Sequence, residues 1–203
     1  MSGGAGMESL PNAWRLFVAI ALPEAVKIEL QHAQEELRAA VSDPRAVRWT
    51  RPEQFHITLK FLGNVDSTTA GAVAAALRRG VDGWCAMRLA AEKIGFFPHP
   101  RFPHVIWAGI RDDQRQLEGL QAKVQSAVGL FASEDRAEPF TGHVTLGRCQ
   151  GIRRAGAEAL FQAAKGMEGR SFGEWEANEV ELIRSELGSG GARYTAVATI
   201  ALG

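Results

Sequence analysis

The chain has 203 residues, and its 23 Lys and Arg residues are balanced by 23 Asp and Glu residues, so the formal net charge is zero. This length suits one domain with a substantial core, or two small lobes packed together. The charge balance excludes a global field that would draw the protein onto long nucleic acid or an anionic membrane. Any contact with nucleic acid should therefore be local and short.

The cysteine content and the first residues indicate where the protein works. Cys85 and Cys149 are the only two cysteines, which are too few and too far apart for a disulfide framework or a clustered metal site. A reducing, cytoplasmic location is therefore predicted.

Residues 1–13 lack a basic start followed by an apolar stretch, and the apolar run at 14–22 is too short to span a bilayer. We expect 1–13 to be a loose or disordered tail, with no export signal or membrane anchor.

The first half of the chain is predicted to alternate strands with helices. Residues 14–22 are apolar, aromatic and β-branched without polar alternation, which is typical of a strand buried on both faces. Pro23 is well placed to begin a helix, whose apolar residues recur at helical spacing up to about Val41. The elements that follow are a short strand at 47–49, a turn at Pro52, a strand from His56, an Ala-rich helix at 66–80 and a strand at 87–97.

The second half repeats this order. It is predicted to contain a strand at 104–110, a helix capped by Asp112 or Asp113, a strand from His143, a helix at 154–165, a strand at 176–187, a turn at 188–191 and a closing strand at 194–202. Positions 16, 24 and 56 correspond to 105, 113 and 143, which lie 89, 89 and 87 residues further on. The pattern indicates a duplicated strand-helix-strand-helix-strand unit.

Residues 56–59 and 143–146 are two copies of one short pattern, His-Ile-Thr-Leu and His-Val-Thr-Leu. Side chains of a strand alternate between its faces, so the histidine and the threonine of each copy share one face and the two apolar residues share the other. A pseudo-two-fold axis between the duplicated units would place the two polar faces opposite each other across a cleft. Two imidazoles would then face one substrate.

Two facing imidazoles suit acid-base chemistry. The ordinary pKa of histidine is about 6.5, so one ring of a pair can accept a proton while the other donates one. In-line displacement at phosphorus needs such groups on opposite sides, each contributing about 10²- to 10⁴-fold in rate. Threonine hydroxyls on the same face can donate to the non-bridging phosphate oxygens and hold the phosphate in place.

Sequence around both motifs resembles one known family. The segments that carry the resemblance are 51–55 before His56, 61–63 after it, 139–140 before His143, Arg148 after it, 96–98 and 191–194. Together with the paired His-x-Thr-Leu motifs (the HxTx pattern), they resemble the 2H phosphoesterase superfamily, and in particular its RNA 2′,3′-cyclic phosphodiesterases, also called 2′-5′ RNA ligases. The likeness spans residues 14–202. One departure is Gly142, where the family usually has proline.

The resemblance implies hydrolysis of a terminal 2′,3′-cyclic phosphate to a 2′-phosphate, without a metal or other cofactor. By motif position, His56 would be the proton donor to the departing 3′ oxygen, and His143 would be the proton acceptor that activates water. Thr58 and Thr145 would bind the phosphate. The substrate would be an RNA end or a small cyclic-phosphate nucleotide, and we expect a monomer without an obligate protein partner or membrane contact.

Two further residues are candidates for substrate binding. Arg148 resembles the family's phosphate-contacting arginine, although strict alternation places it on the opposite face from His143, so it could help only if the strand ends or bulges there. Phe61 lies at the equivalent position after His56 and could stack on a base. Its apolar surroundings in the sequence favour a place in the core.

Three competing hypotheses stay open at this stage. A metal site is disfavoured, because the two histidines lack a third ligand at a recognisable spacing. A non-catalytic module that binds RNA ends or nucleotides is the alternative from a different class. A true 2′-5′ ligase would use the same groups, because microscopic reversibility makes the forward and reverse reactions share one site.

The fold class predicted for residues 14–203 is α+β. We expect a single bilobal domain with an internal duplication, in which each lobe has an antiparallel sheet with helices on its outer side and the active-site groove lies between the sheets. The residues expected in the lobe cores are Phe17, Val18, Leu30, Leu37, Ile57, Leu59, Ile106, Val124, Val144, Leu146, Leu182 and Ile200.

Overall fold

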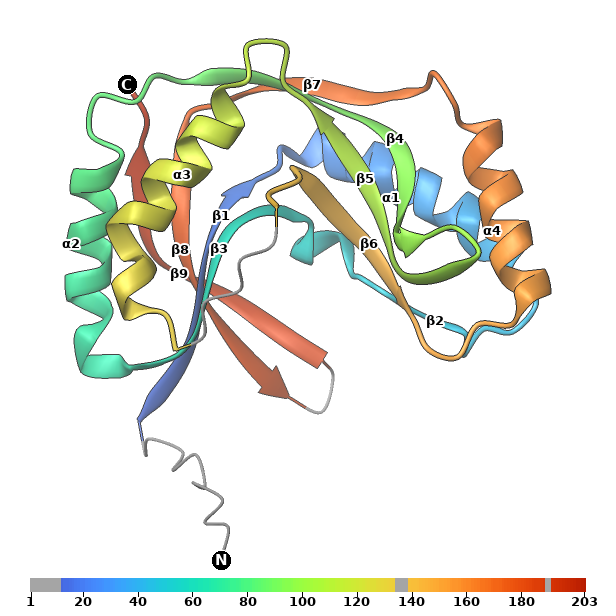
Figure 1. The fold of residues 1–203 in the computed structure, drawn as a ribbon, viewed down its shortest axis with the longest axis horizontal. Coiled ribbons are helices and arrows are strands. Elements are labelled where there is room, and N and C mark those ends of the chain that lie inside the picture. The colour runs from blue at the N-terminus through green and yellow to red at the C-terminus, as the bar shows by residue number, and fades with distance from the viewer. Residues whose placement is uncertain (1–11, 134–138, 189–190) are drawn as a thin grey trace, which may run out of the picture.

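The computed structural model describes residues 12–133, 139–188 and 191–203 (Figure 1). Most of the tail predicted at 1–13 and the middle of the turn predicted at 188–191 lie outside these residues. The strands are β1 (Ala13–Ala21), β2 (Val47–Trp49), β3 (His56–Asp66), β4 (Met87–His99), β5 (Phe102–Arg111), β6 (His143–Cys149), β7 (Ser171–Ala177), β8 (Glu179–Gly188) and β9 (Gly191–Ala201). The α-helices are α1 (Glu24–Ala40), α2 (Ala70–Gly80), α3 (Gln116–Val128) and α4 (Arg154–Gly166).

The strands form one curved antiparallel sheet with two halves of the same strand order. The order is β7-β4-β5-β6-β3-β1-β8-β9, and β2 pairs with β6. The halves are therefore β6-β5-β4-β7 and β3-β1-β8-β9, and they meet where β3 pairs with β6 through Ile57 and Val144. This arrangement confirms the predicted α+β bilobal class and brings the two His-x-Thr strands side by side at its centre.

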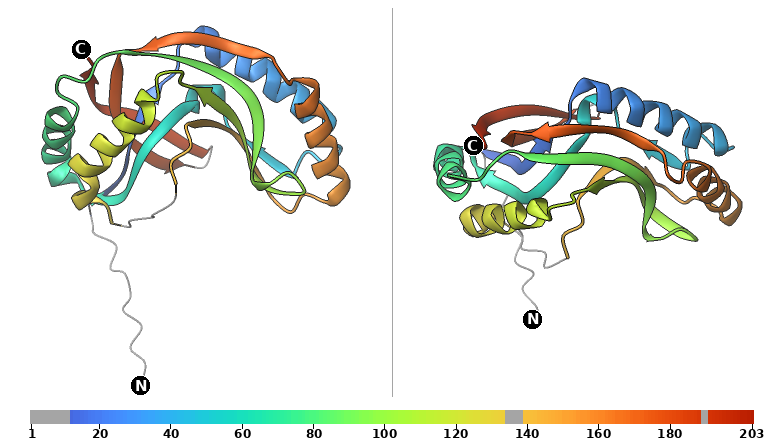
Figure 2. Two further views of the ribbon diagram at one scale, coloured as in Figure 1. Left: turned by 45° about the horizontal axis from the view of Figure 1, so that its top comes forward. Right: turned by 90° about the horizontal axis from the view of Figure 1, so that it is seen from above.

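The four helices cover the two outer ends of the sheet. Helices α2 and α3 pack together at one end, and α1 packs with α4 at the other (Figures 1 and 2). The apolar stripe of α1 explains its position, because Val26, Leu30, Ala33 and Leu37 are buried while His32 on its other side is exposed. Helices thus leave the inner face of the sheet free for a site.

All twelve residues predicted for the core are buried. Eleven of them belong to the main hydrophobic core. Phe17 lies instead in a small separate cluster with Ala19, Ile183 and Tyr194. That cluster lies beside His56, so Phe17 supports the site rather than the helices.

The strand predicted at 176–187 corresponds to β8, but β7, which comes just before it, was not predicted from the sequence. β7 begins at Ser171 and pairs with β4, whereas β8 pairs with β1 in the other half of the sheet. Asn178 separates them, and the chain crosses between halves at this point. Gly173, at φ +117°, interrupts the alternation that would have identified β7 in the sequence.

Candidate active site

His56 and His143 are the first residues of β3 and β6. The two strands are antiparallel and pair at Ile57 and Val144. Continuing this register by one residue places His56 beside Thr145 and Thr58 beside His143. Ile57 and Val144 are fully buried on the helix side, so the four polar side chains share the inner face. Diagonal neighbours on adjacent strands have their side chains about 7–8 Å apart, which leaves room for one phosphate between the imidazoles.

Each imidazole is oriented by the backbone two residues before it. His56 Nδ1 donates to the Gln54 carbonyl oxygen at 2.7 Å, and His143 Nδ1 donates to that of Thr141 at 2.7 Å. This leaves Nε2 of each ring to accept or donate a proton on the other side of the ring. In the neutral state of His56, the Thr58 hydroxyl donates to Nε2 at 2.9 Å. Both rings thus present the nitrogen that proton transfer requires.

Burial lowers the pKa of both histidines. Loss of solvent is the largest cause for His56, whose pKa falls to about 4 despite the opposing hydrogen bond to Gln54, and the charge of His143 lowers it further. Burial is also the main cause of the lowered pKa of His143, and Arg148 contributes to it. The coupling means that a proton on one ring disfavours a proton on the other. One charged and one neutral imidazole is therefore an accessible state of the pair.

Aromatic side chains pack against each histidine. Phe17 and Tyr194 lie 4.9 and 5.5 Å from the His56 ring, between centroids. Phe97 and Trp107 lie 5.2 and 6.2 Å from the His143 ring. These four residues come from β1, β9, β4 and β5, and the sequence analysis did not assign them to the site. They desolvate the imidazoles and restrict their orientation.

Gln54 links the His56 strand to the β8–β9 hairpin. Its side chain donates to the Ala192 carbonyl oxygen at 2.5 Å, and Arg51 donates to the same oxygen at 2.8 Å. Its own carbonyl oxygen accepts the His56 hydrogen bond. The hairpin that carries Tyr194 is thus fastened to the segment that orients His56.

A β-bulge brings Arg148 onto the inner face. On β6, Gly147 pairs with Ile106 and Thr145 pairs with Trp107, so Leu146 is an extra residue. Leu146 and Gly147 are both buried, and Arg148 is exposed on the side of Thr145. The strict alternation that placed Arg148 on the opposite face is therefore wrong, because the bulge resets it.

The same bulge occurs 87 residues earlier and exposes Phe61. On β3, Lys60 pairs with Val18 and Thr58 pairs with Ala19, which leaves Leu59 as the extra residue. Phe61 is 55% exposed, so its place in the core, favoured by the sequence, is wrong. It lies on the same inner face as Thr58.

A groove of about 540 Å³ runs along this inner face. Its lining includes Arg15, Thr58, Phe61, His143 and Arg148, and residues of α3 form one side. The structure thus gathers His56, Thr58, His143, Thr145, Arg148 and Phe61 in and beside one groove.

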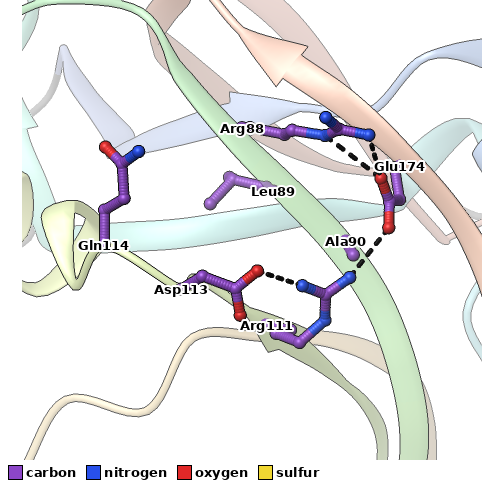
Figure 3. Close-up of a pocket in the computed structure, with 7 residues that line it drawn as sticks. All are labelled: Arg88, Leu89, Ala90, Arg111, Asp113, Gln114 and Glu174. Carbon is purple, nitrogen blue, oxygen red and sulfur yellow. Dashed lines mark hydrogen bonds and ion pairs between the residues drawn. The ribbon is translucent and has the colours of Figure 1, made fainter.

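A second, smaller hollow of about 90 Å³ is lined by residues of β4, β5 and β7 together with Asp113 and Gln114, and neither histidine lines it (Figure 3). Arg111 forms ion pairs with Glu92, Asp113 and Glu174, and Arg88 pairs with Glu174 at 2.5 Å. The charges of this cluster pair with one another, and the cluster joins β4, β5 and β7. We interpret it as a network of ion pairs that connects these strands.

Two observations concern metals and membranes. In the part of the chain that the structure describes, no three His, Cys, Asp or Glu side chains lie together as a metal centre would require. Over the same residues, no helix combines the length and the apolar character needed to cross a bilayer.

Comparisons with known proteins agree with this geometry. The family model described as LigT like Phosphoesterase matches residues 20–107. The RNA 2′,3′-cyclic phosphodiesterase of Thermus thermophilus is 31% identical over 192 residues, which cover 93% of this chain and 90% of that protein. The protein of the same name from Methanothermobacter thermautotrophicus is 26% identical over 181 residues, covering 89% and 95%.

A solved structure, that of E. coli LigT complexed with 3′-AMP, matches with a TM-score of 0.72 at 26% identity and covers 94% of this chain and 98% of that one. The fold and the paired histidine strands define a 2H phosphoesterase. The chain belongs to the RNA 2′,3′-cyclic phosphodiesterase family.

The lowered pKa values predict an acid optimum for catalysis. Acid-base catalysis by this pair requires one protonated and one neutral imidazole, and lowered pKa values make both rings neutral at neutral pH. As the pH falls below 6.5, the singly protonated pair becomes more abundant. Near pH 4, where the pKa of His56 lies, the doubly protonated pair accumulates, and it has no neutral imidazole left to act as the base. We expect kcat/KM to peak between these values and to fall about tenfold per pH unit on the alkaline side. Initial rates at constant ionic strength measure this profile, and a maximum at or above neutral pH would contradict the expectation.

Proposed function

We propose that the protein hydrolyses the 2′,3′-cyclic phosphate at an RNA end, or in a small nucleotide, to a 2′-phosphate. The observation that supports this most strongly is the pairing of β3 with β6, which brings the strands of two oriented imidazoles and two threonines side by side, with these four side chains on one face. A curated relative of this name, 31% identical over most of both chains, supports the substrate class.

In the proposed reaction, the cyclic phosphate lies between His56 and His143. Thr58 and Thr145 donate to its non-bridging oxygens, and Arg148 offsets its negative charge. The anion raises the pKa of both imidazoles on binding, which favours the protonated form of one of them.

Two proton transfers then accompany in-line displacement. His143 Nε2 takes a proton from water as the water oxygen forms its bond to phosphorus. His56 Nε2 gives a proton to the 3′ oxygen as the bond between phosphorus and that oxygen breaks. The product has a 2′-phosphate and a free 3′ hydroxyl, and proton exchange with solvent restores both rings. The reverse sequence would join RNA ends through a 2′-5′ linkage.

The side chains that carry these steps belong to the chain itself, and we propose that it acts without a metal or cofactor. We further propose that residues 14–203 form a single bilobal, internally duplicated domain that acts as a monomer. A reducing, cytoplasmic location suits Cys85 and Cys149, which are both unpaired.

The proposal is tested with a short RNA that ends in a 2′,3′-cyclic phosphate, beside the same RNA ending in a 3′-phosphate. We expect the cyclic end to be consumed and the 3′-phosphate end to remain unchanged. Binding of both RNAs without turnover of either would show a non-catalytic module, and would overturn the proposal.

We expect Phe61 to stack on the base next to the cyclic phosphate. Loss of a stacked base costs about 1–3 kcal/mol, so Phe61→Ala should raise KM about 5- to 150-fold and change kcat much less. The thermal midpoint should stay near that of wild type, because more than half of the side chain is exposed. Phe102→Ala is the matched control, since Phe102 is 73% exposed on the β4–β5 hairpin and does not line the groove. Equal KM values for both variants would exclude stacking.

A further inference from the structure

Arg48 and Arg148 are held directly opposite each other. They are a cross-strand pair in the β2–β6 ladder, and both side chains are exposed. Like charges in this position repel each other. Among the described residues, neither guanidinium has a carboxylate partner. Two adjacent arginines without carboxylate partners can bind an anion between their guanidinium groups.

A third arginine adds to the same positive region. Arg15 of β1 lines the groove together with Arg148. Arg15 pairs with Ser185 of β8, which pairs with Tyr194 of β9, so the three lie in one row across the sheet. Burial raises the pKa of Tyr194, and the charges of Arg148, Arg15 and Arg48 all oppose that rise. Three arginines from three strands therefore act on one phenol in a chain of zero net charge.

This positive region continues the groove beyond the position of the reacting phosphate, and Arg148 lies between the two. That phosphate lies beside His56, Thr58, His143 and Thr145, at the beginning of β3 and β6. Because Leu146 is the extra residue of a bulge, Thr145 and Arg148 pair with Trp107 and Val105, which are two residues apart on β5, so Arg148 lies about 7 Å further along the strand. The Arg48–Arg148 pair is therefore placed for a phosphate next to the reacting one along the groove.

We propose that Arg48 and Arg148, with Arg15 and Tyr194 at the edge of the site, bind a second phosphate of the substrate. This phosphate is the one on the 5′ oxygen of the terminal nucleoside. The groove then selects RNA ends and 5′-phosphorylated nucleotides over nucleosides that carry only the cyclic phosphate. The inference rests on the proposed function, and it names the feature by which the site recognises its substrate.

Three substrates test this subsite: cytidine 2′,3′-cyclic phosphate, its 5′-phosphorylated form, and a dinucleotide that ends in the same cyclic phosphate. For wild type, we expect kcat/KM to be about 10- to 100-fold higher for the last two, because a phosphate between two arginines forms charge-assisted hydrogen bonds. In Arg48→Ala this preference should fall close to one. Arg79→Ala, which removes an exposed arginine of the outer helix α2, should keep the full preference.

The outcomes separate this inference from the proposed function. Wild-type turnover of all three substrates without a preference would overturn the subsite and leave the phosphodiesterase intact. If no substrate is turned over, calorimetric binding of the same three ligands decides: the subsite predicts tighter binding of the 5′-phosphorylated ligands to wild type, lost in Arg48→Ala. Preference for the 5′-phosphorylated nucleotide but not the dinucleotide would restrict the site to small nucleotides.

The unfolding temperature without ligand distinguishes an arginine that binds substrate from one that stabilises the fold. Because the Arg48–Arg148 pair is repulsive, we expect Arg48→Ala to unfold at the same temperature as wild type or higher. A clearly lower unfolding temperature, with the substrate preference retained, would show that Arg48 supports the fold and would overturn the proposal.

Discussion

Replacing His56 or His143 by glutamine is expected to reduce kcat by about 10²- to 10⁴-fold in each case, because each replacement removes one proton transfer from the displacement at phosphorus. Glutamine fills much of the space between the aromatic neighbours, Phe17 and Tyr194 at His56 and Phe97 and Trp107 at His143. Turnover of an RNA with a 2′,3′-cyclic phosphate end measures the effect.

His32→Gln is the matched control, because His32 is exposed on α1 and has no contact with the groove. It should retain wild-type kcat and KM. The two variants of the site should also bind a product nucleotide, which separates loss of chemistry from loss of fold. Wild-type rates in either site variant would contradict the two-histidine account.

The second large effect concerns the leaving group. A cyclic phosphate of catechol opens to a phenolate, which leaves without needing a proton, whereas a ribose oxygen must receive one. When catechol replaces ribose, the ratio of the His56→Gln rate to the wild-type rate is therefore expected to rise about 10²-fold or more. For His143→Gln, kcat should stay reduced by the same factor with both substrates, because water must still lose its proton.

Rates of ring opening for the two variants and wild type on both cyclic phosphates measure this contrast. Recovery by His143→Gln alone would exchange the proposed roles of donor and acceptor. Equal recovery by both variants, or by neither, would contradict the assignment of separate acid and base functions.

The central part of this site could be predicted from the sequence, because it depends on local alternation. His56 and Thr58 lie two residues apart in a strand, as do His143 and Thr145, so each pair must share a face. The apolar residues between them are buried as predicted. The repeat of 87 residues then related the two strands to each other.

For Arg148 and Phe61, the alternation of side chains along a strand did not predict the correct face of the sheet. One extra residue, Leu146 on β6 or Leu59 on β3, shifts the side chains that follow it, including Arg148 and Phe61, to the other face. A bulge of this kind depends on the partner strand, and the sequence of the bulged strand does not reveal it. The two bulges lie 87 residues apart, which is also the offset between the two histidines, so each copy of the motif is followed by the same bulge.

The aromatic residues around the histidines depend on contacts between distant segments. Tyr194 reaches His56 because β9 pairs with β8 and β8 pairs with β1. Phe97 reaches His143 through the pairing of β4 with β5 and of β5 with β6. To predict this order from the sequence, one would have to identify β7 and the crossing between β7 and β8, and β7 was not predicted.

The most direct test of the central claim is the position of the phosphate in the product, read by phosphorus nuclear magnetic resonance. Purified protein is incubated with excess chelator and an RNA that ends in a 2′,3′-cyclic phosphate. The account predicts conversion to the 2′-phosphate alone, at the rate observed without chelator. A 3′-phosphate product, or loss of turnover in chelator that returns with added metal, would contradict it.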